Sequence, residues 1–190
     1  MSKLPEGALW IWEIKLDGYR AIAVKVDCSV NLFSRRHKSF SHQYPHIVQA
    51  LAELPEGTVV DGEIVALDEG RPSFNLLQNF RSAASNIHYF IFDLLVFNHR
   101  DLTKLPLVER RKVLKSLKLG SERIRISEQF ESSAANMLAA VRQQGLEGVI
   151  AKRKDSLYEA GKRTGIVGQV QGQSRARVGD RRLPTRTSRL

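Results

Sequence analysis

EIKLDGYR, residues 13–20, is the stretch from which the fold of this chain can be inferred. Its lysine, Lys15, ends an apolar and aromatic run at residues 9–14, where partial burial would disfavour the charged form of the amine and make it a better nucleophile. The pair Asp17-Gly18 can reverse the backbone and return Arg20 to the neighbourhood of Lys15. A reactive nitrogen beside a permanent cation is suited to attack on a phosphate.

Length and composition limit the alternatives. A chain of 190 residues with 42% hydrophobic residues can bury one good core, so we expect one main domain. No apolar run approaches the roughly 20 residues that cross a bilayer, and the N-terminus has no signal-peptide core. We therefore expect a cytoplasmic protein with no membrane partner. The single cysteine, Cys28, cannot form an internal disulfide and is expected to be inert, and no Cys/His cluster has zinc-ligand spacing.

The net charge of +10 suggests a polyanionic partner, but most of it lies in one segment. Residues 161–190 hold eight Lys/Arg against one acid, which is +7 of the total. From residue 166 onward the chain has no aromatic residue, few aliphatic ones and no helical or strand period. This composition predicts a basic, disordered tail over residues 166–190 after a domain at 1–165.

The hydrophobic pattern of residues 1–165 mixes short strands and short helices, which predicts an α+β domain. Strands are expected at 9–14, 21–27, 30–34, 58–68, 87–97, 124–126 and 146–153, and helices at 39–54, 74–80, 105–117 and 132–144. The strands at 21–27 and 30–34 are expected to form a meander with the lysine strand. In the helix at 105–117, Val108, Arg111, Leu114 and Leu117 recur at helical spacing, and the outer face is expected to be basic.

Charged residues that are costly to bury recur on the predicted strands. They are Lys15 with Arg20, Glu63 after Asp61-Gly62, and Glu147 with Lys152 five residues on. In one core they must pair with each other or with a ligand. The first alternative is a set of structural ion pairs. The second is a site for a nucleoside triphosphate and its metal, because acids hold Mg²⁺ and cations hold phosphates. Phe92 could offer a flat face to a base, although such a phenylalanine is more often a core residue.

The chain resembles the adenylation domain of ATP-dependent DNA ligases of the bacterial repair and end-joining type, over roughly residues 6–165. Five motifs in the family's order carry the resemblance: Lys15-Leu16-Asp17-Gly18-Tyr19-Arg20, Ser34-Arg35, Asp61-Gly62-Glu63, Phe92-Asp93-Leu94-Leu95 and Glu147-Gly148-Val149-Ile150-Ala151-Lys152. The resemblance implies an ATP-grasp-like nucleotidyltransferase domain with antiparallel sheets flanked by helices.

The resemblance also implies a role for each motif residue. Lys15 would attack the α-phosphorus of ATP, release pyrophosphate and hold AMP, which would then pass to the 5′-phosphate of a nick before a 3′-hydroxyl displaces it. The implied contacts are ribose and phosphate for Arg20 and Arg35, the ribose hydroxyl and a metal for Glu63, adenine stacking for Phe92, the adenine edge for Glu13, a metal for Glu147 and the α-phosphate for Lys152. ATP and Mg²⁺ (or Mn²⁺) are the implied cofactors. Nicked double-stranded DNA is the implied partner, end-joining proteins are further candidates, and a monomer is expected.

Two alternative functions stay open from the residues. An mRNA guanylyltransferase shares Lys-x-Asp-Gly but takes GTP, whereas the spelling of the Asp61-Gly62-Glu63 and Phe92 segments favours ATP. A non-catalytic remnant, or a basic nucleic-acid-binding module, would account for the tail.

The resemblance ends where the composition changes. The family's next motif, a Lys-x-Lys after a tryptophan, is expected just after residues 158–164 but is absent, as is the OB-fold domain that follows it in the family. Translated one nucleotide later, codons from residue 165 onward can spell ALWVKYKVNQGQELVIGGY, which resembles that motif and the first OB-fold strand. We therefore predict a frameshift near Gly165, poor adenylylation and weak or absent nick sealing by this chain. The gene's nucleotide sequence tests the frameshift.

Overall fold

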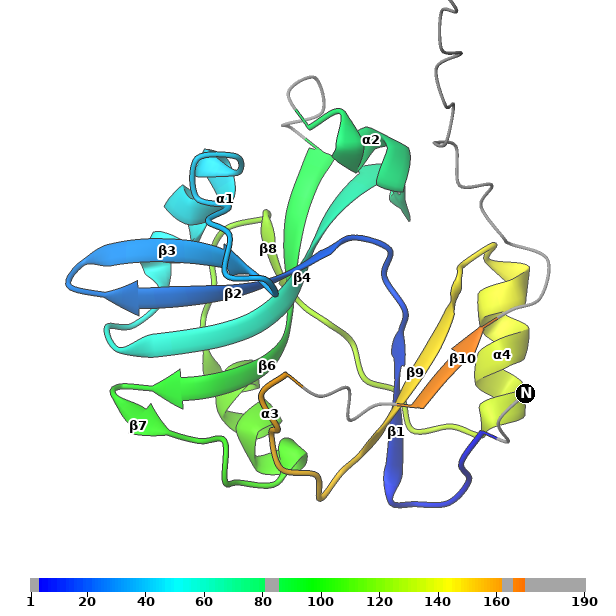
Figure 1. The fold of residues 1–190 in the computed structure, drawn as a ribbon. Coiled ribbons are helices and arrows are strands. Elements are labelled where there is room, and N and C mark those ends of the chain that lie inside the picture. Colours follow the sequence, from blue (N-terminus) through cyan, green and yellow to red (C-terminus); the bar gives the residue numbers. More distant parts are fainter. Residues whose placement is uncertain (1–3, 81–85, 162–165, 170–190) are drawn as a thin grey trace, which may run out of the picture.

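Two β-sheets organise the protein (Figure 1). The computed structural model describes residues 4–80, 86–161 and 166–169. The larger sheet has the strand order β3-β2-β4-β6-β7, with β5 paired to β4 and β8 to β6, and the smaller sheet has the order β1-β9-β10. All of these strand pairs are antiparallel except β6 with β8. The predicted architecture of antiparallel sheets with flanking helices is therefore confirmed.

Most element bounds follow the hydrophobic pattern of the sequence, but the helix expected at 39–54 begins only at residue 45, and the two-residue strands at 71–72 and 100–101 are not among those expected. The strands are β1 (Trp10–Ile14), β2 (Tyr19–Val26), β3 (Ser29–Ser34), β4 (Thr58–Asp68), β5 (Arg71–Pro72), β6 (Ile87–Phe97), β7 (Arg100–Asp101), β8 (Ile124–Ile126), β9 (Gly148–Arg153) and β10 (Ile166–Gln169). The helices are α1 (Pro45–Ala50), which a 3-10 turn at Leu51–Glu53 continues, α2 (Phe74–Gln78), α3 (Leu107–Ser116) and α4 (Ala134–Gln143). None of these helices is long and apolar enough to span a membrane.

The larger sheet has one core face and one open face. Along β6, Tyr89 and Ile91 are fully buried in the main core, which also contains residues of α1, α2 and α3. The alternate residues Phe90 and Phe92 point to the other face and are half-buried. The near-continuous apolar run of this strand predicts burial on both faces, but only the first face is fully covered.

A second, smaller core lies between α4 and the smaller sheet. Trp12 of β1 and Val149 of β9 are buried there against Met137 and Val141 of α4. The indole Nε1 of Trp12 donates a hydrogen bond of 2.9 Å to the carbonyl of Ser132, just before the helix. This packing fixes β1, and with it the residue that follows the strand, Lys15.

The predicted meander is only half correct. β2 and β3 form the expected hairpin, but the lysine strand β1 pairs with β9 of the other sheet, with Trp12 opposite Ala151. The Asp17-Gly18 pair therefore lies in a crossing between two sheets and not in a hairpin turn. A Cβ on Gly18 would lie 2.1 Å from the carbonyl oxygen of Ile64. Glycine is needed here because the backbone of β4 approaches so closely.

The predicted tail is wrong for its first four residues. Residues 166–169 form the edge strand β10, paired with β9 with Val167 opposite Ile150. Four residues are too short to show a strand period in the sequence, although Ile and Val favour strands. Residues 162–165 and 170–190 lie outside the described residues, so the remainder of the tail prediction stays a prediction.

Candidate functional site

A pocket of about 680 Å³ is lined by residues of both sheets. Seven of the eight site residues predicted from the sequence line it: Glu13, Lys15, Arg20, Arg35, Glu63, Phe92 and Lys152. The eighth, Glu147, contacts Lys15 through its carboxylate. The fold therefore brings all of the predicted residues together, although they come from six separate parts of the chain.

Lys15 is held where β1 leaves the smaller sheet. Its backbone N–H donates to the carbonyl of Gly148 at 2.9 Å, and its Nζ forms an ion pair with Oε1 of Glu147. The Lys15 side chain is 23% exposed, so the predicted partial burial is present. The other carboxylate oxygen of Glu147, Oε2, is buried and has no hydrogen-bond partner within the described part of the chain. Glu147 thus keeps one free acceptor beside the lysine.

Lys152 and Glu13 form a second ion pair in the pocket. Nζ of Lys152 lies 2.6 Å from Oε2 of Glu13, whose Oε1 accepts a hydrogen bond of 3.0 Å from Gln129. The same Nζ lies 4.5 Å from the centre of the Phe92 ring. The alternative of internal ion pairs is therefore seen for these charges, and the alternative of a site for a nucleoside triphosphate and its metal stays a prediction. Gln129 gives no signal in the sequence, since it lies 116 residues from Glu13.

Arg20 is anchored to a carboxylate that is fully buried. Its Nε and Nη2 donate to the two oxygens of Asp61 at 3.0 and 2.6 Å, and Asp61 is 0% exposed. The hydrogen bonds that Arg20 donates to Asp61 raise the pKa of the guanidinium against the opposing effect of burial. The hydroxyl of Tyr158 donates to the same carboxylate at 2.8 Å. The sequence marks Asp61 only as part of a motif and gives no sign of Tyr158.

Glu63 is the pocket carboxylate without a close partner. It lies opposite Arg20 in the pairing of β2 with β4, and in the described residues its carboxylate accepts no hydrogen bond. Burial raises the pKa of Glu63 to about 8, although the positive charges of Arg20 and Lys15 act in the opposite direction. A carboxylate that is costly to ionise and faces a pocket is a candidate for a ligand or a metal.

A tight turn after β3 adds further cations. The backbone N–H of Ser34 donates to the carbonyl of Lys38 at 2.8 Å, and the Ser34 hydroxyl accepts from the backbone N–H of Lys38 at 3.0 Å. Arg35 Nη2 donates to the carbonyl of Gly161 at 3.1 Å. Arg36 and Lys38 also line the pocket, and within the described ranges neither is ion-paired. Of these three cations, only Arg35 lies in one of the sequence motifs.

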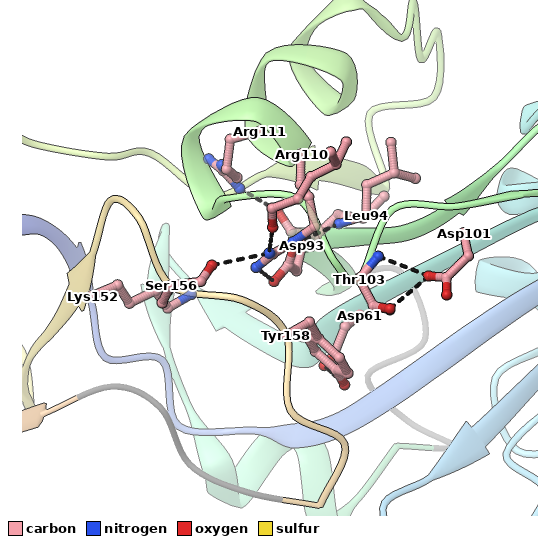
Figure 2. A network of polar contacts seen from close by, with 12 residues as sticks. Asp61, Asp93, Leu94, Asp101, Thr103, Arg110, Arg111, Lys152, Ser156 and Tyr158 are labelled. Atoms are coloured by element: carbon pink, nitrogen blue, oxygen red, sulfur yellow. Dashed lines mark hydrogen bonds and ion pairs between the residues drawn. The ribbon is translucent and has the colours of Figure 1, made fainter.

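The predicted basic outer face of α3 does not extend to Arg110, whereas the burial of Arg111 agrees with its helical spacing to Leu114. Arg110 is 1% exposed and holds Asp93 with two hydrogen bonds of 2.8 Å, as Figure 2 shows. Arg111 is also buried and donates to the carbonyl of Ile91 at 3.4 Å. Both arginines lie on the inner side of the helix, where the Asp93 carboxylate accepts hydrogen bonds from Arg110 and the Ile91 carbonyl accepts one from Arg111.

Comparison with known proteins identifies the class. The family model of the ATP-dependent DNA ligase domain matches residues 1–167. The chain is 38% identical over 162 residues to the multifunctional non-homologous end joining protein LigD of Pseudomonas aeruginosa. This alignment covers 82% of this chain and 19% of that protein. The chain is 33% identical over 159 residues to the SPbeta prophage-derived DNA ligase-like protein LigB of Bacillus subtilis, covering 82% and 58%.

Solved structures agree with the sequence matches. The ligase domain of M. tuberculosis LigD superposes with a TM-score of 0.75 at 35% identity, over 84% of this chain and 53% of that one. A mycobacterial DNA ligase D complexed with ATP and MES gives a TM-score of 0.74 at 34% identity, over 84% and 54%. The chain belongs to the ATP-dependent DNA ligase family. Within the family it corresponds to the adenylation domain of the bacterial end-joining type, and it spans less than two thirds of each of these relatives.

Proposed function

We propose that this domain charges itself with AMP from ATP through Lys15, as the first step of sealing nicked double-stranded DNA. The observation that carries the proposal is the position of Lys15 Nζ in a pocket that also contains Arg20, Lys152 and the ring of Phe92. That set supplies one nucleophile, two cations for phosphates and one flat apolar face. The ATP-bound relative supports ATP as the nucleotide.

In the proposed reaction, the ammonium of Lys15, which is ion-paired with Glu147, first loses one proton to solvent, and the resulting neutral amine attacks the α-phosphorus of ATP. A nitrogen–phosphorus bond forms, the bond from phosphorus to the pyrophosphate oxygen breaks, and the amine loses a proton. Glu147 already contacts Nζ and so can accept that proton. Charge builds on the non-bridging oxygens in the transition state, where the fixed cations Arg20 and Lys152 stabilise it.

Nucleotide binding must rearrange one pair in the pocket. Lys152 Nζ lies over the Phe92 ring and is paired with Glu13, so an adenine stacked on Phe92 takes the place that the ammonium occupies. A phosphate can replace Glu13 as the partner of Lys152, because both are anionic oxygen acceptors. ATP thus exchanges an internal ion pair for one between the protein and its substrate.

Mg²⁺ (or Mn²⁺) fits the carboxylates of this pocket. Glu147 has a buried oxygen without a hydrogen-bond partner among the described residues, and Glu63 has a carboxylate that burial makes costly to ionise. No group of three or more His, Cys, Asp or Glu side chains converges in the described part of the chain. Glu63 and Glu147 would therefore hold the ion together with phosphate oxygens and water, as is usual for Mg²⁺. The ion would neutralise charge on the phosphates.

The DNA substrate and the partners of this domain are inferred from its relatives and from the cations of the pocket. Arg35, Arg36 and Lys38 line the pocket, so a phosphate of the nicked duplex that approaches the nucleotide meets three cations. The names of the relatives include non-homologous end joining, which makes end-joining proteins the candidate partners of a monomeric domain.

Nucleotide labelling tests the function. We expect incubation with Mg²⁺ and α-labelled ATP to leave one labelled AMP on the protein, and the same incubation with α-labelled GTP to leave none. The reason is that Phe92 can stack on any base, whereas Glu13 would meet the base edge, where adenine and guanine differ in their hydrogen-bonding groups. Label from GTP would instead favour a capping-type guanylyltransferase. The absence of label from either nucleotide would favour a non-catalytic module.

The variant Glu63→Gln should gain stability at alkaline pH. The pKa of Glu63 is raised from an ordinary 4.5 to about 8, so ionisation opposes folding as the pH rises from about 5 through 8. Below this range the carboxyl is protonated in the folded state, and the two proteins should differ little. We expect the variant's melting temperature to exceed that of the parent by several degrees at pH 9 and by much less at pH 5 to 6.

Two comparisons keep the Glu63 result specific. Glu56→Gln on an exposed loop is the matched control and should show no such pH-dependent gain. A gain for Glu63→Gln that is equal at pH 5 and pH 9 would contradict the raised pKa.

A further inference from the structure

Tyr158 belongs to a segment that is fastened at both ends although it has no regular structure. This segment, residues 154–161, follows β9 and lines the pocket with Ser156, Tyr158 and Glu159. It is named below the strap. In Figure 2 the strap passes beside α3, with Ser156 and Tyr158 directed toward the polar network around Asp93 and Asp61.

The first amides of α3 hold the strap. The N–H of Leu107 donates to the carbonyl of Ser156 at 2.9 Å, and the N–H of Val108 donates to the carbonyl of Lys154 at 3.1 Å. The opening amides of a helix lack partners within the helix, so the strap satisfies them. Arg110 Nη1 adds a hydrogen bond of 3.1 Å to Ser156, while its Nε and Nη2 hold Asp93.

The side chain of Tyr158 therefore lines the pocket from a backbone segment that these hydrogen bonds hold in place. Its own N–H donates to the carbonyl of Thr103 at 3.0 Å, and its hydroxyl donates to Oδ2 of Asp61 at 2.8 Å. The proximity of Asp61 and burial raise the pKa of Tyr158 to about 12, burial having the larger effect. The hydroxyl therefore stays a donor throughout the physiological range.

The carboxylate of Asp61 has a limited number of fixed contacts. Oδ1 accepts from Nε of Arg20, and Oδ2 accepts both Nη2 of Arg20 and the Tyr158 hydroxyl. Asp61 is 0% exposed, so water cannot take over any of these bonds. Nη2 also donates a long hydrogen bond of 3.5 Å to the Tyr158 hydroxyl, so Nε and Nη2 are both engaged and Nη1 is the nitrogen of Arg20 that is left to donate to a ligand in the pocket.

We propose that Tyr158 is a positioning residue: its hydroxyl fixes the Asp61 carboxylate, which in turn fixes the direction in which Arg20 presents its guanidinium to the nucleotide. The inference rests on the proposed transfer of AMP to Lys15. Tyr158 itself touches no reacting atom. The strap thus couples the start of α3 to the geometry of a cation on β2, two elements that are far apart in the sequence.

The test compares Tyr158→Phe with the parent chain at saturating ATP and Mg²⁺. Phenylalanine keeps the ring and removes only the hydroxyl, so one hydrogen bond to a charged group is lost. We expect the rate of lysyl-AMP formation to fall about tenfold, which corresponds to about 1.4 kcal/mol, with less than a twofold change in the ATP concentration for half-maximal rate. A purely structural role would lower the melting temperature and leave this rate unchanged.

Leu157→Ala is the matched control, because Leu157 is the neighbouring strap residue and is 50% exposed. We expect its rate to equal that of the parent. An unchanged rate for Tyr158→Phe, or an equal fall for Leu157→Ala, would overturn the assignment.

A second measurement needs no activity. In ¹⁵N NMR of the arginine side chains, the Nε–H signal of Arg20, assigned with Arg20→Lys, should be sharp in the parent and should broaden or shift in Tyr158→Phe but not in Leu157→Ala. If the parent forms no AMP adduct, the proposed function fails while this comparison still decides the role of Tyr158. An Arg20 signal that is identical in the parent and in Tyr158→Phe refutes the positioning role.

Discussion

Replacing Lys15 by alanine should abolish the AMP adduct completely. The amine of Lys15 is the nucleophile of the proposed reaction, and alanine offers no atom that can form the bond to phosphorus. Lys15→Arg should fail as well, because a guanidinium stays protonated in proteins and has no free electron pair at neutral pH. Intact-mass spectrometry after incubation with ATP and Mg²⁺ measures the adduct, and peptide mapping of the parent locates it.

The matched control is another lysine outside the pocket. Lys112 lies on α3 with its side chain 72% exposed, and Lys112→Ala should form the adduct as the parent does. The sequence predicts poor adenylylation, since the Lys-x-Lys motif is missing, so the incubation should run long enough to detect a small yield. An adduct that persists in Lys15→Ala, or that maps to a different residue in the parent, would contradict the assignment.

The sequence predicts the local features of this site well. The bounds of β4 and β6 follow from apolar runs that are continuous in the chain, and the eight predicted site residues lie in motifs that each span a few residues. Burying such charges singly is costly, so a run of charged residues on strands already indicates a shared pocket. That argument needs no knowledge of which strand pairs with which.

The partners of these residues could not be predicted, because they are distant in sequence. Lys15 meets Glu147 across 132 positions, and Lys152 meets Glu13 across 139. The assignment of β1 to the smaller sheet depends on how Trp12 packs against α4, which no local period encodes. For the same reason the role of Gly18 is clear only when the carbonyl of Ile64 is seen beside it.

The buried arginines of α3 show where charge misleads. The helical spacing of Arg111 with Val108 and Leu114 places it on the inner face, but the charge of Arg110 suggests that its side chain faces water. Arg110 instead neutralises Asp93 and donates to the carbonyls of Leu105 and Ser156 at 2.5 and 3.1 Å. The signal that could have found this pair is the acid directly after Phe92 on a strand that is otherwise apolar, since such an acid requires a cation.

Breaking the Asp93–Arg110 pair should be the most destabilising single change on α3. Arg110→Met leaves the carboxylate of Asp93, which is 5% exposed, without its cation. Removing one partner of a buried ion pair typically lowers the free energy of unfolding by about 3–5 kcal/mol. We expect a loss in this range in urea unfolding monitored by circular dichroism, with the slope against urea unchanged if the folded state is otherwise intact.

The same helix supplies the comparison that isolates burial as the cause. Glu109 and Lys112 form an exposed pair with side chains 46% and 72% accessible, and Lys112→Met there should cost no more than about 1 kcal/mol. The double variant Asp93→Leu/Arg110→Met removes both charges and should recover part of the loss, because a buried pair can be replaced by apolar residues at little cost. Recovery should stay incomplete, since Arg110 also satisfies the carbonyls of Leu105 and Ser156. If Arg110→Met costs as little as Lys112→Met, the pair does not stabilise the fold, and the strap is held in place by its other hydrogen bonds, such as those from the backbone N–H groups of Leu107 and Val108.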